Sequence, residues 1–448
     1  MEYFNADIEL MSRSELDIFV DERVRNTIRY SAENSPFYKR WFKKNKIDPF
    51  NIKEHEDLRE LPIISGKTIR ENQPPQRNEF LFKSVECSEV FTIHETSGTS
   101  GIPKTFFSTW DDWKRYAEKY ARIFVSQGLG EGDRMAVCAS YGMNVGANTM
   151  TVAAKRIGFT IIPEGKCTFP VRVMTTYKPT AIVGSVFKLI HLAQRLEDSG
   201  IDPKESGVEK LIVGGEGFAP ESRAYLDKIW GLDVCNTYGS TEGAMCGECK
   251  IREGLHVPED LVHMDLYNEK MKDFVSEGNE GKIVLTTLIP NGEKAGTVLI
   301  NYETDDQTEV LSKEKCRCGR THMRIKNPKR VSENVYLEET SFNRIDIESG
   351  VFHPQNMKYL TGEYEAFLYY DPVNNQTTMQ VGLECRDIHS CDIKLIKDNF
   401  LSSFFKNNKI LEDYFTEGIF DIIFRTVKTG DLGLYKLKGR PKRIVDRR

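Results

Sequence analysis

The chain lacks the features that mark membrane proteins and disulfide-bonded scaffolds. Its 448 residues contain no apolar run near the roughly 20 residues of a membrane span. The first 17 residues have neither the basic segment nor the apolar stretch of a signal peptide. Ten cysteines are few for a disulfide scaffold of this length, and a reducing compartment would keep them as thiols. We therefore expect a cytoplasmic protein with no membrane partner.

The chain also lacks a large charge excess of either sign. It carries 62 basic and 67 acidic residues, which gives a net charge of -5. This balance argues against general nucleic-acid binding and favours small-molecule partners. With 39% hydrophobic and 29% charged residues, the composition is ordinary for a globular protein, and the length suffices for two or three domains.

Helix-like and strand-like segments follow one another in a pattern typical of an α/β fold. Residues 1–85 have apolar residues at helical spacing, and residues 86–329 alternate short apolar runs with amphipathic stretches. After residues 278–290 the strands look antiparallel. We expect a large N-terminal domain of α/β sheet subdomains with a small barrel-like β part. Residues 330–448 should then form a small α+β C-terminal domain.

The segment HETSGTSGIPKTFF, residues 94–107, is rich in glycine and hydroxyl residues and contains one lysine. Such a loop can turn N–H groups and hydroxyls toward one anion, and Lys104 adds a mobile positive charge. The GxxxxGK[ST] pattern of GTPases is absent. We interpret the segment as a phosphate-binding loop, with a flexible surface loop as the alternative. Its candidate ligands are Thr96, Ser97, Gly98, Thr99, Ser100 and Gly101.

Four further segments resemble the signature of the adenylate-forming superfamily of acyl-CoA synthetases and adenylation domains. They read GGEGF, TYGSTEG, NYETDD and PKRVSEN, at residues 214–218, 237–243, 301–306 and 328–334. Residues 34–63, 316–325 and 438–448 are similar to phenylacetate-CoA ligases and, more closely, to the coenzyme F390 synthetases of methanogens. This resemblance implies that residues 86–329 form an ATP-binding core and that residues 330–448 form a mobile domain. It also suggests a homodimer.

The resemblance implies a role for individual residues of the nucleotide site. The loop with Lys104 would hold the β- and γ-phosphates of ATP, Thr241 would touch the α-phosphate, and Glu242 would bind Mg²⁺. Asp306 would hold the ribose hydroxyls, although ETDDQ would also make a good turn. Arg330 would approach ribose and phosphate, with Ser332 at the hinge. The adenine would stack on Tyr238, in a site that includes Gly215, Glu216, Gly217 and Gly239.

Closely spaced cysteines indicate a metal site. Paired thiolates with a fourth ligand from elsewhere are what tetrahedral zinc requires. The resemblance to phenylacetate-CoA ligases implies a structural zinc on Cys249, His256, Cys316 and Cys318. Cys246 is then a spare thiol or replaces His256, and four unrelated buried thiols are the alternative to a zinc site.

Two positions depart from the family pattern. The usual C-terminal lysine falls on Arg440, so that Arg440, Lys438 or Lys442 would serve in its place, or the tail is merely a solvated basic end. The glycine that clears a path for the pantetheine arm in CoA ligases is replaced by Glu339. A glutamate there would repel phosphopantetheine, which favours an enzyme that stops at nucleotidyl transfer.

The resulting hypothesis is a coenzyme F390 synthetase-like adenylyltransferase. It would move AMP from ATP to the 8-hydroxyl of the deazaflavin F420 and release pyrophosphate, with residues 140–148 and 161–169 lining the acceptor pocket. The first alternative is a phenylacetate-type aryl-CoA ligase, which needs an aromatic acid and CoA. The second is a non-catalytic regulator that binds adenine nucleotides.

Overall fold

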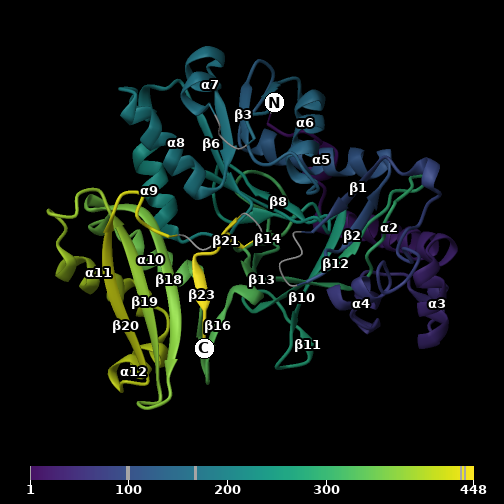
Figure 1. The fold of residues 1–448 in the computed structure, drawn as a ribbon. Coiled ribbons are helices and arrows are strands. Elements are labelled where there is room, and N and C mark those ends of the chain that lie inside the picture. The colour runs from purple at the N-terminus through teal and green to yellow at the C-terminus, as the bar shows by residue number, and fades with distance from the viewer. Residues whose placement is uncertain (1, 97–100, 166–168, 434–435, 438–439) are drawn as a thin grey trace. The chain divides into compact units, whose positions relative to one another are not determined.

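A computed structural model describes residues 2–448 except 97–100, 166–168, 434–435 and 438–439. For residues 436–437 and 440–441 it describes the backbone but not the side chains. The chain divides into two compact units (Figure 1). The larger unit holds residues 1–216 and 232–329, and the smaller holds residues 217–231 and 330–448. The segment 217–231 thus leaves the larger unit and packs with the C-terminal residues.

The larger unit begins with helices whose ends are set by local capping. Ser12 and Glu15 form a capping box at the start of α2, and Ser35 caps α3 with Pro36 in its first turn. The helices of this unit are α1 (Ala6–Glu9), α2 (Arg13–Asn34), α3 (Pro36–Asn45), α4 (Gly66–Glu71), α5 (Trp110–Ser126), α6 (Gly146–Ile157), α7 (Pro170–Tyr177) and α8 (Val186–Asp198).

The strands of the larger unit form a β1–β2 hairpin and one long mixed sheet. They are β1 (Thr92–Glu95), β2 (Thr105–Ser108), β3 (Arg134–Cys138), β4 (Thr160–Ile162), β5 (Ala181–Gly184), β6 (Lys210–Gly214), β7 (Cys235–Gly239), β8 (Met245–Glu248), β9 (Leu255–His256), β10 (Val262–Asn268), β11 (Asp273–Phe274), β12 (Glu280–Thr287), β13 (Tyr302–Ser312) and β14 (Arg324–Ile325). β15 (Lys329–Arg330) lies where the chain passes to the smaller unit.

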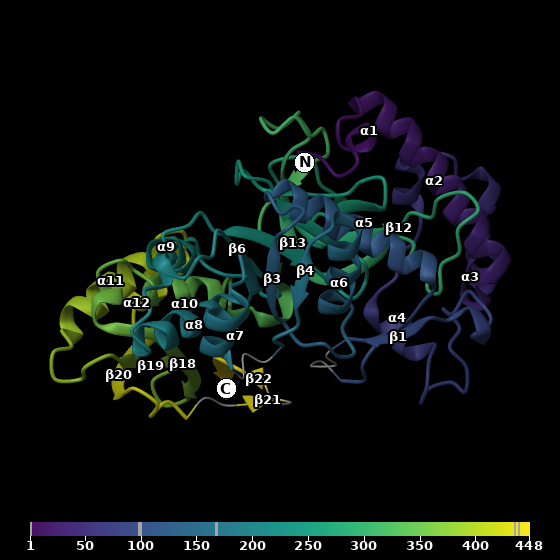
Figure 2. The same cartoon turned by 90° about the horizontal axis from the view of Figure 1, so that it is seen from above.

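The long sheet is parallel at one end and antiparallel at the other. Strands β4, β3, β5, β6 and β7 pair in parallel, and the order continues antiparallel through β8, β9, β14, β13, β12, β10 and β11. The expected barrel-like part is wrong, because the two-residue strands β9 and β14 join the antiparallel strands to the parallel ones in one open sheet. Figure 2 shows α5 and α6 beside β3 and β4.

Among the described residues of the larger unit, three clusters of buried apolar side chains form its core, and two of them include helices. One packs α5 and α6 against the parallel strands, with Phe124, Met135 and Ile212 fully buried. The other packs the N-terminal helices against the antiparallel region, where Tyr38 of α3 and Tyr302 of β13 are both buried. Residues 1–85 therefore belong to the same unit as the sheet that they cover.

The smaller unit has a four-stranded sheet in the order β20–β19–β18–β23. Aromatic side chains fill its core, with Phe342, Phe400 and Phe420 fully buried. Its helices are α9 (Pro220–Trp230), α10 (Arg344–Val351), α11 (Ile393–Phe405) and α12 (Lys409–Thr416). Its strands are β16 (Val335–Leu337), β17 (Thr340–Phe342), β18 (Leu360–Asp371), β19 (Gln376–Cys385), β20 (Phe420–Lys428), β21 (Lys436–Leu437), β22 (Arg440–Pro441) and β23 (Ile444–Asp446).

The cysteines are not all thiols, contrary to expectation. Cys385, the last residue of β19, forms a disulfide with Cys391 across a short loop. A spacing of six residues has no signature in the sequence, because it is the fold of the strand end that brings the two sulfurs together. None of the helices in the described ranges is long and apolar enough to cross a bilayer.

Candidate active site

Several residues predicted to bind the nucleotide lie where the parallel strands of the larger unit end. The carboxyl ends of β6 and β7 lie side by side, with Gly214 paired to Thr237. A side chain at Gly214 would meet the Thr237 carbonyl oxygen at 2.9 Å, so glycine is required for this close approach. Gly215 and Glu216 follow β6, and Gly239 ends β7. Ligands of open α/β sheets bind at this edge.

The candidate phosphate-binding loop connects the β1–β2 hairpin. Its two ends are closed by Thr96 and Lys104, since Thr96 N donates to Lys104 O at 3.0 Å and Lys104 N donates to Thr96 Oγ1 at 3.0 Å. The predicted ligands Ser97, Gly98, Thr99 and Ser100 lie outside the described residues. Gly101 has a φ of +130°, a conformation that favours glycine. The hairpin thus fixes where the loop begins and ends.

Lys104 lies between two buried oxygen atoms. Its Nζ donates to Glu242 Oε1 at 2.6 Å and to Tyr302 Oη at 2.6 Å. Burial opposes the charge of the ammonium, but the Glu242 carboxylate and the Tyr302 hydroxyl outweigh it and raise the pKa of Lys104. Burial, together with Glu242, raises the pKa of Tyr302 to about 12, so this hydroxyl stays protonated. Two predicted site residues are therefore in contact, and Tyr302 joins them.

Tyr238 and Asp306, predicted to bind adenosine, also lie together. The Tyr238 hydroxyl donates to Asp306 Oδ2 at 2.7 Å. Burial and the Asp306 carboxylate hold the pKa of Tyr238 well above its ordinary value. Asp306 is buried inside β13, so the alternative that it is a turn residue is wrong. The strand pattern of NYETDDQTEV was hidden by its many polar residues.

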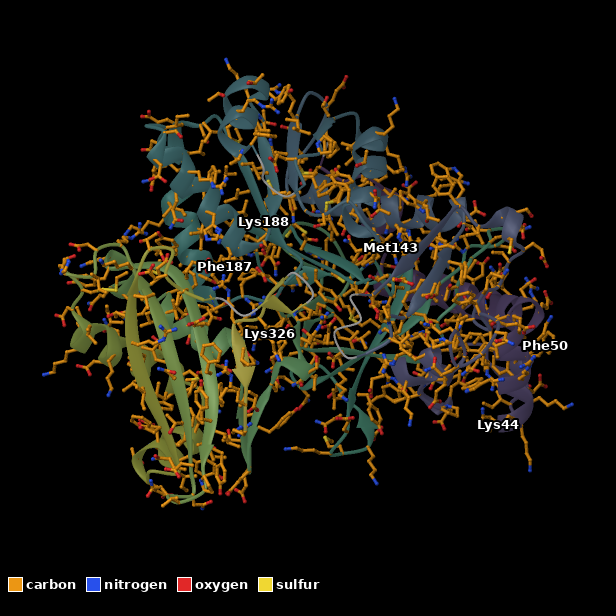
Figure 3. All side chains as sticks on the ribbon, viewed as in Figure 1. Lys44, Phe50, Met143, Phe187, Lys188 and Lys326 are labelled. Atoms are coloured by element: carbon orange, nitrogen blue, oxygen red, sulfur yellow. A yellow bond between two sulfur atoms is a disulfide. The ribbon has the colours of Figure 1, made fainter. Side chains whose placement is uncertain are left out.

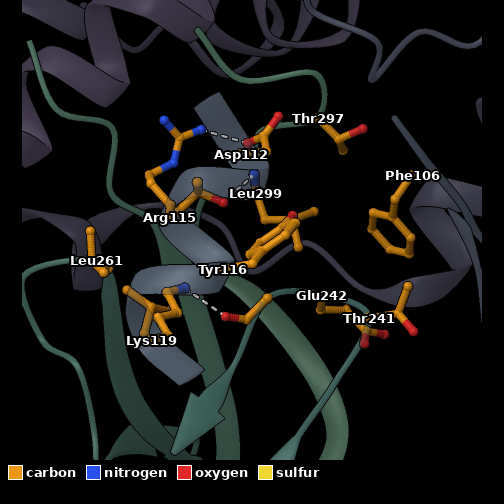
Figure 4. Close-up of a pocket in the computed structure, with 13 residues that line it drawn as sticks. Phe106, Asp112, Arg115, Tyr116, Lys119, Thr241, Glu242, Leu261, Thr297 and Leu299 are labelled. Atoms are coloured by element: carbon orange, nitrogen blue, oxygen red, sulfur yellow. Dashed lines mark hydrogen bonds and ion pairs between the residues drawn. The ribbon is translucent and has the colours of Figure 1, made fainter. Parts of the chain in front are cut away.

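Thr241 and Glu242 occupy the middle of a tight turn after β7. Gly243 N donates to Ser240 O at 3.1 Å, and Ser240 N donates to Ala244 O at 2.8 Å. Gly243 has a φ of +99°, which a residue with a side chain adopts only with strain. Figure 4 shows the cavity that Thr241 and Glu242 line together with Lys119 and Arg115 of α5.

One of the two segments expected to line an acceptor pocket, residues 161–169, is tied to the end of β3 by a lysine. Lys188 Nζ donates to Cys138 O at 2.8 Å and to Gly165 O at 3.1 Å, which ties the end of β3 to the loop after β4. Met143 belongs to the neighbouring loop, where its carbonyl oxygen accepts a 3.0 Å hydrogen bond from Glu95 N. Figure 3 labels Met143, Phe187 and Lys188. The loop that contains Met143 therefore lies beside the β1–β2 hairpin.

Four predicted metal ligands come together from distant segments. One ligand atom from each of Cys249, His256, Cys316 and Cys318 lies within 4.8 Å of the others. Cys249 Sγ is 4.0 Å from Cys316 Sγ, and Cys318 Sγ is 3.6 Å from His256 Nε2. Hydrogen bonds from Cys249 and His256 lower the pKa of the Cys318 thiol, which favours the thiolate that binds zinc. Three sulfurs and one imidazole nitrogen fit a closed tetrahedral site.

Cys246 stays apart from this cluster. It is fully buried in β8, and burial raises the pKa of its thiol to about 12. The fourth ligand was expected to be His256 or Cys246. The structure brings His256 to Cys249, Cys316 and Cys318 and leaves Cys246 in the core. The cysteines of this cluster are also not unrelated buried thiols, since all three face one another.

The N-terminus closes over the cysteine loop. Tyr3 Oη donates to Cys318 O at 2.8 Å, and Arg320 Nε donates to Glu9 Oε2 at 2.6 Å. Both members of the ion pair are buried. The loop at residues 316–322 is therefore held by the first residues of the chain.

Several predicted site residues belong to the smaller unit. These are Gly217, Arg330, Ser332 and Lys442, and their roles toward the nucleotide stay predictions. Arg440 lies in the β21–β22 hairpin, but its side chain and Lys438 are outside the described part of the chain. Glu338 and Glu339 form the exposed two-residue turn between β16 and β17, where Glu338 has a φ of +44°.

Sequence reasoning missed two buried residues next to the site. Tyr302 lies inside the NYETDD segment, at the start of an otherwise polar strand. An aromatic residue at this position was the one sequence feature that could have indicated its burial. Lys119 lies on the buried face of α5 between Tyr116 and Tyr120, and a lysine on an apolar helix face was its only signal.

Comparisons with known proteins agree with this arrangement. A family model described as "AMP-binding enzyme" matches residues 39–287. The phenylacetate-coenzyme A ligase of Thermus thermophilus is 28% identical over 328 residues, covering 72% of each chain, and that of Pseudomonas putida is 26% identical over 384 residues, covering 84% of each. A 2-hydroxyisobutyryl-CoA ligase structure in the postadenylation state matches all of this chain and 93% of its own, with a TM-score of 0.83 at 20% identity, which shows a shared fold. The chain therefore belongs to the AMP-binding enzyme family, as an ATP-dependent adenylate-forming enzyme that resembles phenylacetate-CoA ligases.

Proposed function

We propose that this protein is an ATP-dependent aryl-CoA ligase of the phenylacetate-CoA ligase type. The observation that carries the proposal is the contact of Lys104 with Glu242 and Tyr302 beside the Tyr238–Asp306 pair. These groups suit the triphosphate, the metal and the adenosine of one ATP molecule. The choice of a carboxylic acid and CoA as co-substrates rests on the phenylacetate-coenzyme A ligases to which the chain is similar.

In the first half-reaction a carboxylate oxygen of the acid attacks the α-phosphorus of ATP. A P–O bond forms to the acid as the bond to pyrophosphate breaks, so the products are an acyl-adenylate and pyrophosphate. Lys104 would move from Glu242 to a phosphate oxygen and offset the charge that develops there. Bound Mg²⁺ supplies further charge neutralisation at the phosphates, and Glu242 would hold it.

In the second half-reaction the CoA sulfur attacks the acyl carbonyl carbon. A C–S bond forms, the C–O bond to AMP breaks, and the thiol proton passes to solvent or to the released phosphate. A zinc ion on Cys249, His256, Cys316 and Cys318 would take no part, because four protein ligands would leave it no open position for a substrate.

A second candidate function is adenylyl transfer to the 8-hydroxyl of F420, as in coenzyme F390 synthetases. The observation that favours it is the pair Glu338 and Glu339 at the exposed β16–β17 turn, where related CoA ligases have a glycine for the pantetheine arm. Two carboxylates would repel the phosphates of CoA. The relatives nevertheless favour the ligase, which reverses the preference drawn from the sequence alone.

One assay separates the two candidates. Pyrophosphate release is measured with ATP and Mg²⁺ in four parallel reactions, which contain phenylacetate, phenylacetate with CoA, F420, or no acceptor, and product masses follow. A thioester formed only with the acid and CoA supports the ligase. A product heavier than F420 by one AMP unit, with no thioester, contradicts the ligase and supports the second candidate.

A further inference from the structure

Helix α5 carries a buried lysine that the nucleotide site does not use. Lys119 is 4% exposed, and its Nζ donates to Gly243 O at 2.7 Å. Burial, reinforced by the positive charge of Arg115, lowers the pKa of Lys119 to about 7. Burial of an amine costs folding free energy, so packing alone does not explain a lysine at this position.

The oxygen that Lys119 holds belongs to the turn that carries the catalytic candidates. Gly243 closes this turn with its bond to Ser240, and Thr241 and Glu242 are the two residues between them. The peptide after Gly243 is thus held by the buried amine of Lys119. Figure 4 shows Lys119 on α5 with its hydrogen bond to the turn, and Glu242 and Thr241 beside the same cavity.

The helix that carries Lys119 is itself firmly held. Thr109 and Asp112 form a capping box at its start, and Arg122 near its end makes a buried ion pair with Asp260 at 2.6 Å. A side chain at Gly239 would meet Tyr120 Oη at 3.1 Å, so the turn lies close to this helix at its other end too. Helix α5 therefore forms a rigid support beneath residues 239–243.

Titratable groups from three segments of the chain influence the charge of this amine. Asp112 and Arg115 face it from α5, Cys246 from β8, and Asp260 from the segment before β10. The Tyr116 ring centroid lies 5.9 Å from Nζ. Asp112 pairs with Arg115 and Asp260 pairs with Arg122, whereas Lys119 donates a hydrogen bond to a neutral carbonyl group, that of Gly243.

We propose that Lys119 is a positioning residue that holds the 240–243 turn so that Thr241 and Glu242 meet the α-phosphate and the metal of MgATP. The inference rests on the roles proposed for those two residues. It extends the site to a side chain that lies behind the turn and never touches the nucleotide. A donor of the length of lysine is required, because a shorter side chain on α5 does not reach the Gly243 oxygen.

The test compares ATP binding with and without metal in the full chain. Lys119→Met keeps the apolar stem and removes the donor, and Lys119→Arg keeps a donor and a charge. Lys114→Met is the matched control, since Lys114 is an exposed lysine on the same helix that pairs with Asp111. Dissociation constants are measured by calorimetry with Mg²⁺ and with EDTA, together with the thermal unfolding temperature.

We expect Lys119→Met to weaken MgATP binding about tenfold and binding of metal-free ATP less than twofold, because a buried hydrogen bond is lost at the turn proposed to bind the metal. Lys119→Arg should stay within about threefold of the wild type, and Lys114→Met should equal it. A purely structural role would weaken both forms of ATP alike and lower the unfolding temperature. If Lys119→Met does not fold, Lys119→Gln, whose amide is too short to reach, should show the same selective loss.

Two results would overturn the inference. One is MgATP binding by folded Lys119→Met within twofold of the wild type, and the other is an equal loss with and without metal. If the wild type binds ATP with the same affinity with and without Mg²⁺, both the inference on Lys119 and the proposed role of Glu242 are wrong. Failure of the ligase proposal is seen separately, as the absence of a thioester in wild-type reactions whose ATP binding is intact.

Discussion

Lys104 Nζ and Glu242 Oε1 lie 2.6 Å apart, so the cation and the carboxylate assigned to the two ends of MgATP neutralise each other when no nucleotide is bound. Both side chains are largely buried, which strengthens their attraction. If Lys104 binds the phosphates and Glu242 binds the metal, as predicted, ATP or Mg²⁺ alone would leave one of these charges without a partner, so we expect the two to bind together. This exchange predicts how each residue responds to mutation.

Glu242→Gln should separate metal-free binding from catalysis. Without the carboxylate, Lys104 is available to phosphate, so metal-free ATP should bind as well as in the wild type or better. Pyrophosphate release with Mg²⁺ should fall by about a hundredfold or more, because the metal loses its ligand. ATP titration in EDTA and a pyrophosphate assay in Mg²⁺ measure the two effects. Release within twofold of the wild type would show that Glu242 is not the metal ligand.

Tyr302→Phe should impair ATP use without unfolding the protein. The change removes the hydroxyl that accepts a hydrogen bond from Lys104 and leaves the ring in the core. We expect the KM for ATP to rise about fivefold to tenfold, in line with one lost hydrogen bond to a charged group. The control is Tyr38→Phe, another fully buried tyrosine of the same core, whose hydroxyl accepts from Ile300 N at 2.8 Å. That variant should lose about 1 kcal/mol of stability and keep the KM.

The stability of the larger unit should depend on pH through Lys119. The folded pKa of about 7 lies below the ordinary lysine value, so between these two values the unfolded chain binds the proton and the folded chain does not. By linkage, the contribution of Lys119 to stability is least favourable below pH 7 and improves as pH rises toward 10. Between pH 6 and pH 9.5 the unfolding free energy of the wild type should therefore increase by a few kcal/mol relative to that of Lys119→Met, at about 1.4 kcal/mol per pKa unit. Urea titrations at both pH values measure it, and a difference that stays constant would place the lysine in water.

Removal of the cysteine cluster should expose its structural role. The purified protein should contain about one equivalent of zinc, and Cys318→Ala should lose both the metal and several degrees of thermal stability. Cys246→Ala should keep the zinc, because Cys246 lies in the core away from the cluster. The test is metal analysis and thermal unfolding of the wild type, Cys318→Ala, Cys246→Ala and His256→Ala. Loss of zinc in Cys246→Ala, with retention in His256→Ala, would show that Cys246 and not His256 is the fourth ligand.

Local sequence patterns predict the α/β order, because strand ends and glycine-rich turns depend on residues close in the chain, and these patterns with the family resemblance mark the segments of the candidate nucleotide site. The contacts Lys104–Glu242 and Tyr238–Asp306 join segments that those patterns had already marked. The same patterns do not show that the antiparallel strands continue the parallel sheet, since β9 and β14 have two residues each and no periodicity. They also cannot show that Lys119 is buried, because its burial depends on β8 and the turn at Gly243, which lie more than 120 residues away.

The bond between Glu9 and Arg320 joins residues 311 positions apart, and it gives synthesis of the chain an order. On the ribosome the N-terminal segment is made first, while the loop that it clasps is made last among the parts of the larger unit. Until residue 320 has emerged, Glu9 has to remain in water, since an unpaired buried carboxylate is expensive. The larger unit therefore reaches its final packing only after translation of nearly three quarters of the chain, and a shorter nascent chain would present its unfinished edge to chaperones.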